Sequence, residues 1–383
     1  MRPLLSTLLL IAALTSCDST STSTLPGSGP ALPSLTRLWS LPKPTTLGQT
    51  TLVDNLMLGS TPNLTAIDVQ AHRVAFTIPL KIDYGRTTIT SLGDHLVALT
   101  GAGQDSLTVL SRTGQVLNTF KLLAGTGIGL NSLGPVVVGT SLYVVSGISL
   151  YKFNTADLLR PDAQPMWVRT YTGLALSSLL VADEDHIVVA VNNADVSRQL
   201  VALDGQGQQR WALDVAPSTQ VASSAYILNS YKDLVIAHAG SAGLQAYKLS
   251  TGARAWDVFP NTDICPGGHA IQSFNLTIAA DKIFMGPWGG TCVLAYHADN
   301  GKLAWVFDAP NNITFDTKPL YLNGVVYASN SRLWALDAET GKPLAQATDD
   351  LNDNTGTPLA FDPIQNQILH WGLSGIFAYR PLK

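Results

Sequence analysis

Two cysteines in the second half of the chain are the residues whose chemistry the sequence singles out most clearly. One opens the segment Cys265-Pro-Gly-Gly-His269, and the other closes the segment Gly286-Pro-Trp-Gly-Gly-Thr-Cys292. Two such thiols can form a disulfide, stay separate and buried, or bind a metal together with His269. The metal interpretation lacks further ligands at the spacings typical of zinc sites. To choose between a disulfide and two separate buried thiols, one must know which elements of the fold carry the cysteines.

These elements belong to a repeat that runs along most of the chain. Its clearest copy spans Arg332 to Leu344, where Trp334 and Leu336 alternate with their neighbours in the period of two that a strand requires. Gly341 then supplies the positive φ of a tight turn. The other copies share a large residue before the turn, and the aligned set is Ile67, Leu110, Phe153, Leu203, Tyr247, Tyr296, Leu336 and Tyr379.

The spacing of the copies predicts the fold class. They recur at intervals of 40 to 50 residues, and a further apolar run such as Leu142–Val145 or Lys282–Met285 precedes each of them. About four strands per period is typical of a propeller blade. The sequence therefore predicts an all-β, eight-bladed β-propeller. The eighth copy stops before its last strand, and we expect the N-terminal segment Leu35–Leu41 to supply that strand and close the ring.

Tryptophans mark the outermost predicted strand of several copies: Trp39, Trp167, Trp211, Trp256 and Trp305. They can serve as stacking platforms for a ligand or as packing between blades. Their fixed place in the repeat favours packing. Blade three has a longer, polar connection between Thr155 and Pro165, which we expect to project from the surface.

The repeat places the two cysteines. In a four-stranded meander, the loop leading into the first strand and the loop joining the second and third strands lie on the same face. Cys265 and Cys292 occupy such loops of blade six. The N-terminal pattern described below indicates export, and disulfides persist in exported proteins, so we expect this pair to be bonded. The same face carries His269 and Trp288, which form a possible binding face for a ligand or partner.

Composition and motifs exclude several functions. Only 13% of residues are charged and 46% are hydrophobic, and the net charge of −4 gives no basic footprint for nucleic acid. No nucleophile elbow, phosphate loop or zinc-protease motif occurs, so no catalytic residue is assigned. The acidic run Asp183–Asp185 is interpreted as a solvated turn, since calcium loops need more oxygen ligands at set spacings. No metal site is expected.

The N-terminus has the pattern of an export signal. One basic residue, Arg2, precedes the apolar run Leu4–Leu14, which is too short to span a membrane. The run ends in Leu14-Thr-Ser-Cys17, which resembles the bacterial lipobox. The resemblance implies that Cys17 is acylated and becomes the mature N-terminus; the alternative is an ordinary cleaved signal. The expected organisation is therefore a signal peptide at 1–16, a lipidated cysteine and flexible linker at 17–34, and a propeller at 35–383.

The repeat unit itself resembles a known family. Ala335-Leu-Asp-Ala-Glu-Thr-Gly341 and the Ala-Trp305 pair are similar to the PQQ-like repeat, Ala-x-Asp-x-x-Thr-Gly with a following Trp. That family includes quinoprotein alcohol dehydrogenases, which bind pyrroloquinoline quinone (PQQ), and BamB-like lipoproteins, eight-bladed scaffolds of outer-membrane protein assembly. In length, lipobox and ring size the chain resembles the second group. The adjacent cysteines of the dehydrogenases are missing here.

The resemblance sets the functional expectation. It implies an exported lipoprotein, held in a bacterial cell envelope by lipid on Cys17, that acts as a non-catalytic scaffold for protein interaction. An outer-membrane β-barrel or another envelope protein is the expected partner, and no cofactor is expected. A PQQ-dependent oxidoreductase and a ligand- or glycan-binding propeller remain as alternatives, so enzymatic activity stays open.

Overall fold

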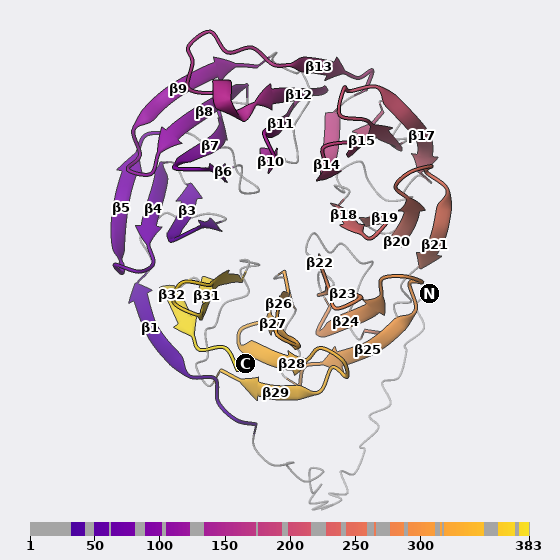
Figure 1. Cartoon of the computed structure of the whole chain (residues 1–383). Coiled ribbons are helices and arrows are strands. Elements are labelled where there is room, and N and C mark those ends of the chain that lie inside the picture. The colour runs from indigo at the N-terminus through magenta and orange to yellow at the C-terminus, as the bar shows by residue number, and fades with distance from the viewer. Residues whose placement is uncertain are drawn as a thin grey trace, which may run out of the picture. The chain divides into compact units, whose positions relative to one another are not determined.

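A computed structural model gives the architecture of the protein. The chain divides into two compact units, Met1–Leu32 and Pro33–Lys383. The structure describes residues 32–42, 50–60, 63–80, 89–101, 105–122, 134–173, 175–193, 198–215, 227–238, 243–258, 264–265, 276–286, 290–310, 315, 318–347, 359–371 and 375–382. These residues form eight four-stranded sheets, which are the blades of a propeller (Figure 1). The predicted fold class is therefore confirmed.

The first four blades share one plan, a meander of four antiparallel strands in chain order. Their strands are β2 (Thr50–Val53), β3 (Leu56–Ser60), β4 (Leu64–Asp68) and β5 (Arg73–Ile78) in blade one; β6 (Ile89–Leu92), β7 (His95–Thr100), β8 (Ser106–Ser111) and β9 (Val116–Lys121) in blade two; β10 (Val136–Val138), β11 (Ser141–Ser146), β12 (Ser149–Asn154) and β13 (Trp167–Thr170) in blade three; and β14 (Ala175–Asp183), β15 (His186–Asn192), β16 (Arg198–Leu203) and β17 (Gln209–Val215) in blade four.

The next three blades repeat the plan, and the last one modifies it. The strands are β18 (Ile227–Tyr231), β19 (Leu234–His238), β20 (Leu244–Lys248) and β21 (Arg254–Val258) in blade five; β22 (Leu276–Ala279), β23 (Lys282–Met285), β24 (Cys292–His297) and β25 (Leu303–Asp308) in blade six; β26 (Leu320–Leu322), β27 (Val325–Ser329), β28 (Leu333–Asp337) and β29 (Pro343–Gln346) in blade seven; and β30 (Ala360–Asp362), β31 (Gln367–Trp371), β32 (Gly375–Tyr379) and β1 (Arg37–Pro42) in blade eight.

The burial of each strand follows its place in the blade. The first strand of each meander lies nearest the centre of the ring and the fourth lies on the outside (Figure 1). Central strands such as β11 are buried at every residue, because neighbouring blades cover both of their faces. Outer strands such as β9 alternate between exposed and half-buried residues. That alternation places one row of side chains against the next blade and one row in solvent.

Blade eight closes the ring as the sequence predicts. Its fourth strand is β1, which pairs antiparallel with β32 from Arg37 opposite Tyr379 to Pro42 opposite Gly375. The amide of Leu35 also donates to the carbonyl oxygen of Gln346 in blade seven, at 2.9 Å. The strand thereby covers an edge of the eighth sheet that would otherwise be unpaired.

Hydrophobic side chains join each blade to the next. Val188 of blade four packs with Val235 of blade five, and Ile236 of blade five packs in one cluster with Ile283 of blade six. Comparable clusters join blades one to two, two to three, three to four, seven to eight and eight to one. Between blades six and seven, the rings of Phe284 and Tyr321 stack with centroids 6.1 Å apart. The core of the protein is therefore a closed series of interblade contacts.

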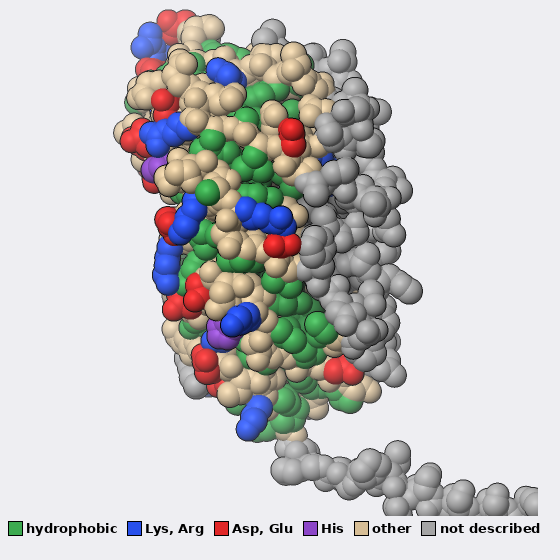
Figure 2. Space-filling model, turned by 90° about the vertical axis from the view of Figure 1, so that its right-hand side faces the viewer, with side chains coloured by type: hydrophobic (Ala, Val, Ile, Leu, Met, Phe, Trp, Pro, Cys, Tyr) green, Lys and Arg blue, Asp and Glu red, His purple; other side chains and the backbone are tan. Residues whose placement is uncertain are grey.

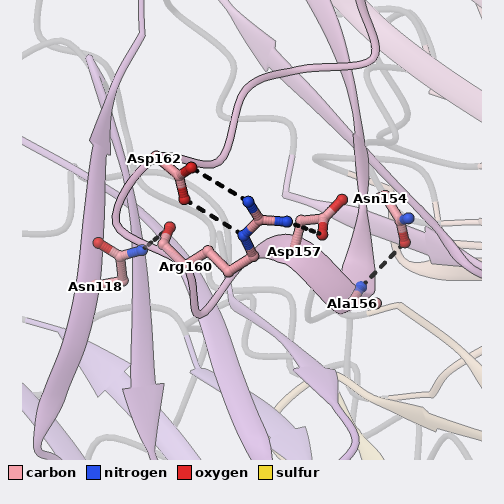
Figure 3. Close-up of polar contacts among 6 residues, drawn as sticks. All are labelled: Asn118, Asn154, Ala156, Asp157, Arg160 and Asp162. Carbon is pink, nitrogen blue, oxygen red and sulfur yellow. Dashed lines mark hydrogen bonds and ion pairs between the residues drawn. The ribbon is translucent and has the colours of Figure 1, made fainter.

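The long connection of blade three is largely exposed, as expected, but part of it packs against the blades. It begins with the short 3-10 helix η1 (Thr155–Asp157) and is anchored to the rim by the residue that follows the helix. Leu158 is fully buried among residues of blades two and three. The Asn118 side-chain amide of β9 donates to the carbonyl oxygens of Leu158 and Arg160, at 3.1 and 2.9 Å. Figure 3 shows the second of these bonds and the Arg160 guanidinium between Asp157 and Asp162.

The described residues contain no transmembrane segment of the helical kind. In this part of the chain, no helix has the length and the apolar character needed to cross a lipid bilayer.

Candidate functional site

The repeat tryptophans pack against the turn of the following blade. The indole Nε1 of Trp167 donates to the carbonyl oxygen of Gly205 at 3.1 Å, and that of Trp211 donates to Leu249 at 2.9 Å. Trp305 makes the same bond to Ala338 at 3.0 Å. Each ring lies over a glycine of that turn, and the pairs are Trp167 with Gly207, Trp211 with Gly252, Trp256 with Gly301 and Trp305 with Gly341. The geometry is that of interblade packing.

Two tryptophans depart from this pattern. Trp39 lies 4.3 Å from the ring of His72, which takes the place of the glycine in blade one with a φ of 54°. Its Nε1 donates to the side-chain oxygen of Gln367, within blade eight, at 2.8 Å. Trp256 keeps its glycine, but its buried Nε1 has no hydrogen-bond partner among the described residues.

A disulfide joins Cys265 and Cys292, the pair that the sequence analysis expects. Cys292 begins β24 and is fully buried, and Cys265 is 5% exposed. Both lie in the cluster that includes Leu276 and Met285 between blades five and six. The bond is therefore a buried crosslink in the core.

The remaining predicted site residues lie outside the described part of the chain. They are Cys17, His269 and Trp288. The acidic segment Asp183–Asp185 is described and forms the turn between β14 and β15. There the Asp183 carboxylate accepts hydrogen bonds from the amide of Asp185 and contacts the His186 ring at 2.9 Å. Across the ranges that the structure describes, no group of three His, Cys, Asp or Glu side chains is arranged to hold a metal.

Polar contacts tie neighbouring blades together at the turns between first and second strands and between third and fourth strands. Lys282 of blade six, whose side chain is 5% exposed, pairs with Glu339 of blade seven at 2.6 Å. Arg112 of blade two pairs with Asp54 of blade one. Figure 2 shows acidic and basic side chains interspersed along one side of the molecule. With both signs interspersed, the described residues of this side present no field of a single sign.

A cavity of about 540 Å³ opens on the inner side of the ring. The first strands of four consecutive blades line it, namely β22, β26, β30 and β2 of blades six, seven, eight and one. Most of the wall is apolar, and it consists of Leu52, Met57, Ile278, Ala279, Pro319, Leu320, Tyr321, Leu359, Ala360 and Phe361. The polar part consists of Thr51, Thr277 and Lys318. The volume lies in the range of small-molecule sites, roughly 300–1,000 Å³.

Lys318 is the only charged residue in the described wall of this cavity. It directly precedes Pro319 and β26, and it is exposed to the solvent inside the ring. The surrounding blades replace part of the water around its ammonium group, and this desolvation lowers the pKa of Lys318. Sequence reasoning missed this residue because it lies in no repeat motif.

A second unpredicted feature is a buried histidine beside a serine. Nε2 of His370 in β31 lies 2.9 Å from the Oγ of Ser329 in β27 of the preceding blade. Both residues are 1% exposed, and burial lowers the pKa of His370 to about 4. A serine nucleophile must reach its substrate, so this pair is a structural contact between blades and not a catalytic dyad.

Comparison with known proteins agrees with the observed architecture. The family model described as outer membrane protein assembly factor BamB matches residues 103–262. The crystal structure of BamB from Moraxella catarrhalis has a TM-score of 0.63 at 14% identity, covering 91% of this chain and 100% of that one. No curated protein matches the sequence.

Other solved structures share the fold. Quinohemoprotein alcohol dehydrogenase from Pseudomonas putida has a TM-score of 0.66 at 11% identity, covering 91% of this chain and 76% of its own. Sqt1 from Saccharomyces cerevisiae has a TM-score of 0.65 at 13% identity, covering 91% and 99%. At such identities the likeness concerns the fold alone. The chain is thus a β-propeller of PQQ-like repeats that resembles BamB.

Proposed function

We propose that the protein is an exported lipoprotein, anchored through Cys17, that acts as a non-catalytic scaffold for protein interaction in a bacterial cell envelope. The observation that carries this proposal is the match of residues 103–262 to the BamB model in a ring of BamB-like architecture. The lipobox-like segment ahead of the ring supports the anchor. A partner engaged in outer-membrane protein assembly, such as an outer-membrane β-barrel, follows from the same resemblance.

The shape of the ring suits this role. Its tightly closed blades provide a rigid platform, and interfaces near ~800 Å² per partner fit easily on such a surface. The exposed apolar side chains include Met166 on the rim of blade three and Ile364 in the turn between β30 and β31. Their exposed fractions are 61% and 66%. Met166 therefore represents the outer rim. Ile364 represents the side of the ring that carries the turns between first and second strands.

The anchor is tested by labelling with radioactive palmitate in a bacterium that processes lipoproteins. The unmodified chain should incorporate label, and Cys17→Ser should not. The double variant Cys265→Ser/Cys292→Ser serves as the control, because it removes the other two cysteines and should keep the label. Equal labelling of Cys17→Ser and the unmodified chain would refute lipidation at this residue.

The scaffold role is tested by photo-crosslinking in intact cells. A benzoylphenylalanine introduced at Met166 or at Ile364 reports on the rim and on the turn side separately. We expect a light-dependent adduct that contains an outer-membrane β-barrel protein at one of these positions, and weaker capture when Cys17 is replaced. Adducts that contain only abundant soluble envelope proteins, at both positions, would contradict the proposed partner.

A quinone-dependent oxidoreductase is the second candidate, because quinohemoprotein alcohol dehydrogenase shares the fold. Sequence resemblance to that class implies PQQ with calcium. The described wall of the cavity does not fit that pair, since it offers one lysine and no carboxylate ligand for calcium. Titration of the purified chain with PQQ and calcium, followed by dye reduction with alcohols, separates the candidates. Stoichiometric binding with turnover would overturn the scaffold proposal.

A further inference from the structure

The cavity inside the ring combines an apolar wall with a single positive charge. Its apolar side chains come from blades six, seven, eight and one, so no single blade forms it. Leu359 and Met57 line it and are buried, with 8% and 3% exposure. Tyr321 is held in place by stacking on Phe284 of the neighbouring blade, with an angle of 6° between the rings. The wall is therefore largely pre-formed.

The charge of Lys318 is not matched by an acid in the wall. None of the described residues that line the cavity is acidic. The acid nearest in sequence to the β30 wall residues, Asp362, is fully buried and already bound: it accepts hydrogen bonds from Gln367 Nε2 at 2.9 Å and from the amide of Ile364 at 2.9 Å. A negatively charged ligand would supply the counter-charge for Lys318 that the described wall lacks.

The two threonines of the wall differ in what they can offer. The Oγ1 of Thr277 donates to the carbonyl oxygen of Pro319, and so links β22 to the residue after Lys318. That bond ties blades six and seven together beside the lysine. Thr51 belongs to β2 on the blade-one side of the cavity. A ligand that reaches both sides would contact the lysine through its anionic end and the apolar wall through its body.

From this combination the geometry points to a binding site for a small organic carboxylate with an aliphatic or aromatic body. The carboxylate pairs with Lys318, and the body lies against the apolar residues of β26, β30 and β2. One lysine matches one carboxylate, which favours a monoanion over a phosphate ester or a tricarboxylate. The same chemistry is offered by a free carboxylic acid and by the C-terminal residue of a peptide. The inference does not depend on the proposed scaffold role.

Isothermal titration tests the site on the purified full chain in lipid nanodiscs, with empty nanodiscs as the blank. The probes are 4-phenylbutyrate, its neutral amide 4-phenylbutyramide, and a hexapeptide ending in phenylalanine with a free or an amidated C-terminus. We expect saturable binding of at least one free carboxylate, and at least tenfold weaker binding of its amide. Binding of phenylbutyrate identifies a free acid as the source, and binding of the free peptide alone identifies a C-terminus.

Substitutions locate the site. Lys318→Met keeps the length of the side chain without its charge and should weaken carboxylate binding at least tenfold, whereas Lys318→Arg should retain most of it. Lys302→Met is the matched control, because this exposed lysine lies outside the cavity, in the turn after β24. Equal binding of acid and amide, unchanged binding by Lys318→Met, or the lack of binding of every probe at millimolar concentration would each overturn the inference.

Discussion

The indole ring of Trp305 in blade six lies directly on Gly341 of blade seven. A Cβ built on Gly341 would come within 2.6 Å of two ring carbons, and the glycine has a φ of 70°. The residue is therefore required for two separate reasons, the space that the ring occupies and the backbone conformation. The same relation recurs at Gly207, Gly252 and Gly301, so each of these turns is shaped to receive a ring from the preceding blade.

Replacing Gly341 by alanine should destabilise the ring by about 3 kcal/mol, because it adds a steric clash with Trp305 to the cost of a positive φ. The free energy of unfolding is measured by urea denaturation. Gly324→Ala is the matched control: Gly324 also has a positive φ, of 81°, but a Cβ there meets nothing within 4 Å. It should cost only about 1 kcal/mol. Equal costs at the two positions would show that the ring contact is unimportant.

Replacing Trp211 by phenylalanine should cost more than the same change at Trp256. The first removes the hydrogen bond from Nε1 to the carbonyl oxygen of Leu249, whereas the Nε1 of Trp256 has no partner among the described residues. The difference should be about 1–2 kcal/mol, the cost of a lost hydrogen bond that leaves its acceptor unpaired. Urea unfolding of both variants measures it. A larger loss at Trp256 would contradict this account.

Deleting residues 33–42 should cause aggregation or a large fall in the thermal midpoint. The deletion removes β1 and leaves the edge of β32 without a partner. It also removes the contact of Trp39 with His72 and the buried Leu35. A control deletion of residues 19–30 leaves β1 in place and should not change the midpoint. The measurements are size-exclusion chromatography and thermal unfolding, and a soluble, equally stable 33–42 deletion would argue against closure by this strand.

Stability should fall as the pH is lowered from about 6.5 to about 4, in part because of His370. Burial lowers its pKa to about 4, so between these values the unfolded chain binds a proton that the folded chain excludes. This group alone accounts for roughly 3 kcal/mol across the window, and above pH 6.5 its effect is absent. Urea unfolding at several pH values should show a flatter profile for His370→Gln. A profile for His370→Gln as steep as that of the unmodified chain would contradict this role of His370.

The sequence is sufficient to predict the ring and its closure. The copies around Leu336, Tyr296 and Tyr247 reveal the blade because a turn glycine and an outer aromatic residue recur at a fixed place. The partner of β1 is also predictable, since a lone Trp-bearing strand at one end matches an incomplete copy at the other. Cys265 and Cys292 follow from the meander, because chain order fixes which connections share a face.

The cavity and the contact between Ser329 and His370 could not be predicted in the same way. The first strands that line the cavity are short, and three residues such as Leu320–Leu322 are too few for alternation to show which side faces the centre of the ring. Lys318 lies outside any repeat position. Ser329 and His370 lie 41 residues apart in the sequence and belong to different blades, so their contact depends on tertiary packing alone. The folding of the 155–165 connection onto the rim likewise depends on Asn118, a residue of another blade.

The pairing of β1 with β32 has a consequence for the order in which the ring can form during synthesis. Strand β1 is synthesised before the other strands of the ring, and its partner β32 is synthesised last, more than 330 residues later. Seven blades can complete their sheets before β32 is synthesised, but the eighth blade cannot. A chain interrupted anywhere before β32 therefore carries two open ends, an unpaired β1 and an uncovered last blade. Only a chain that contains β32 can pair β1 and cover the last blade. Closure of the ring therefore requires synthesis as far as β32.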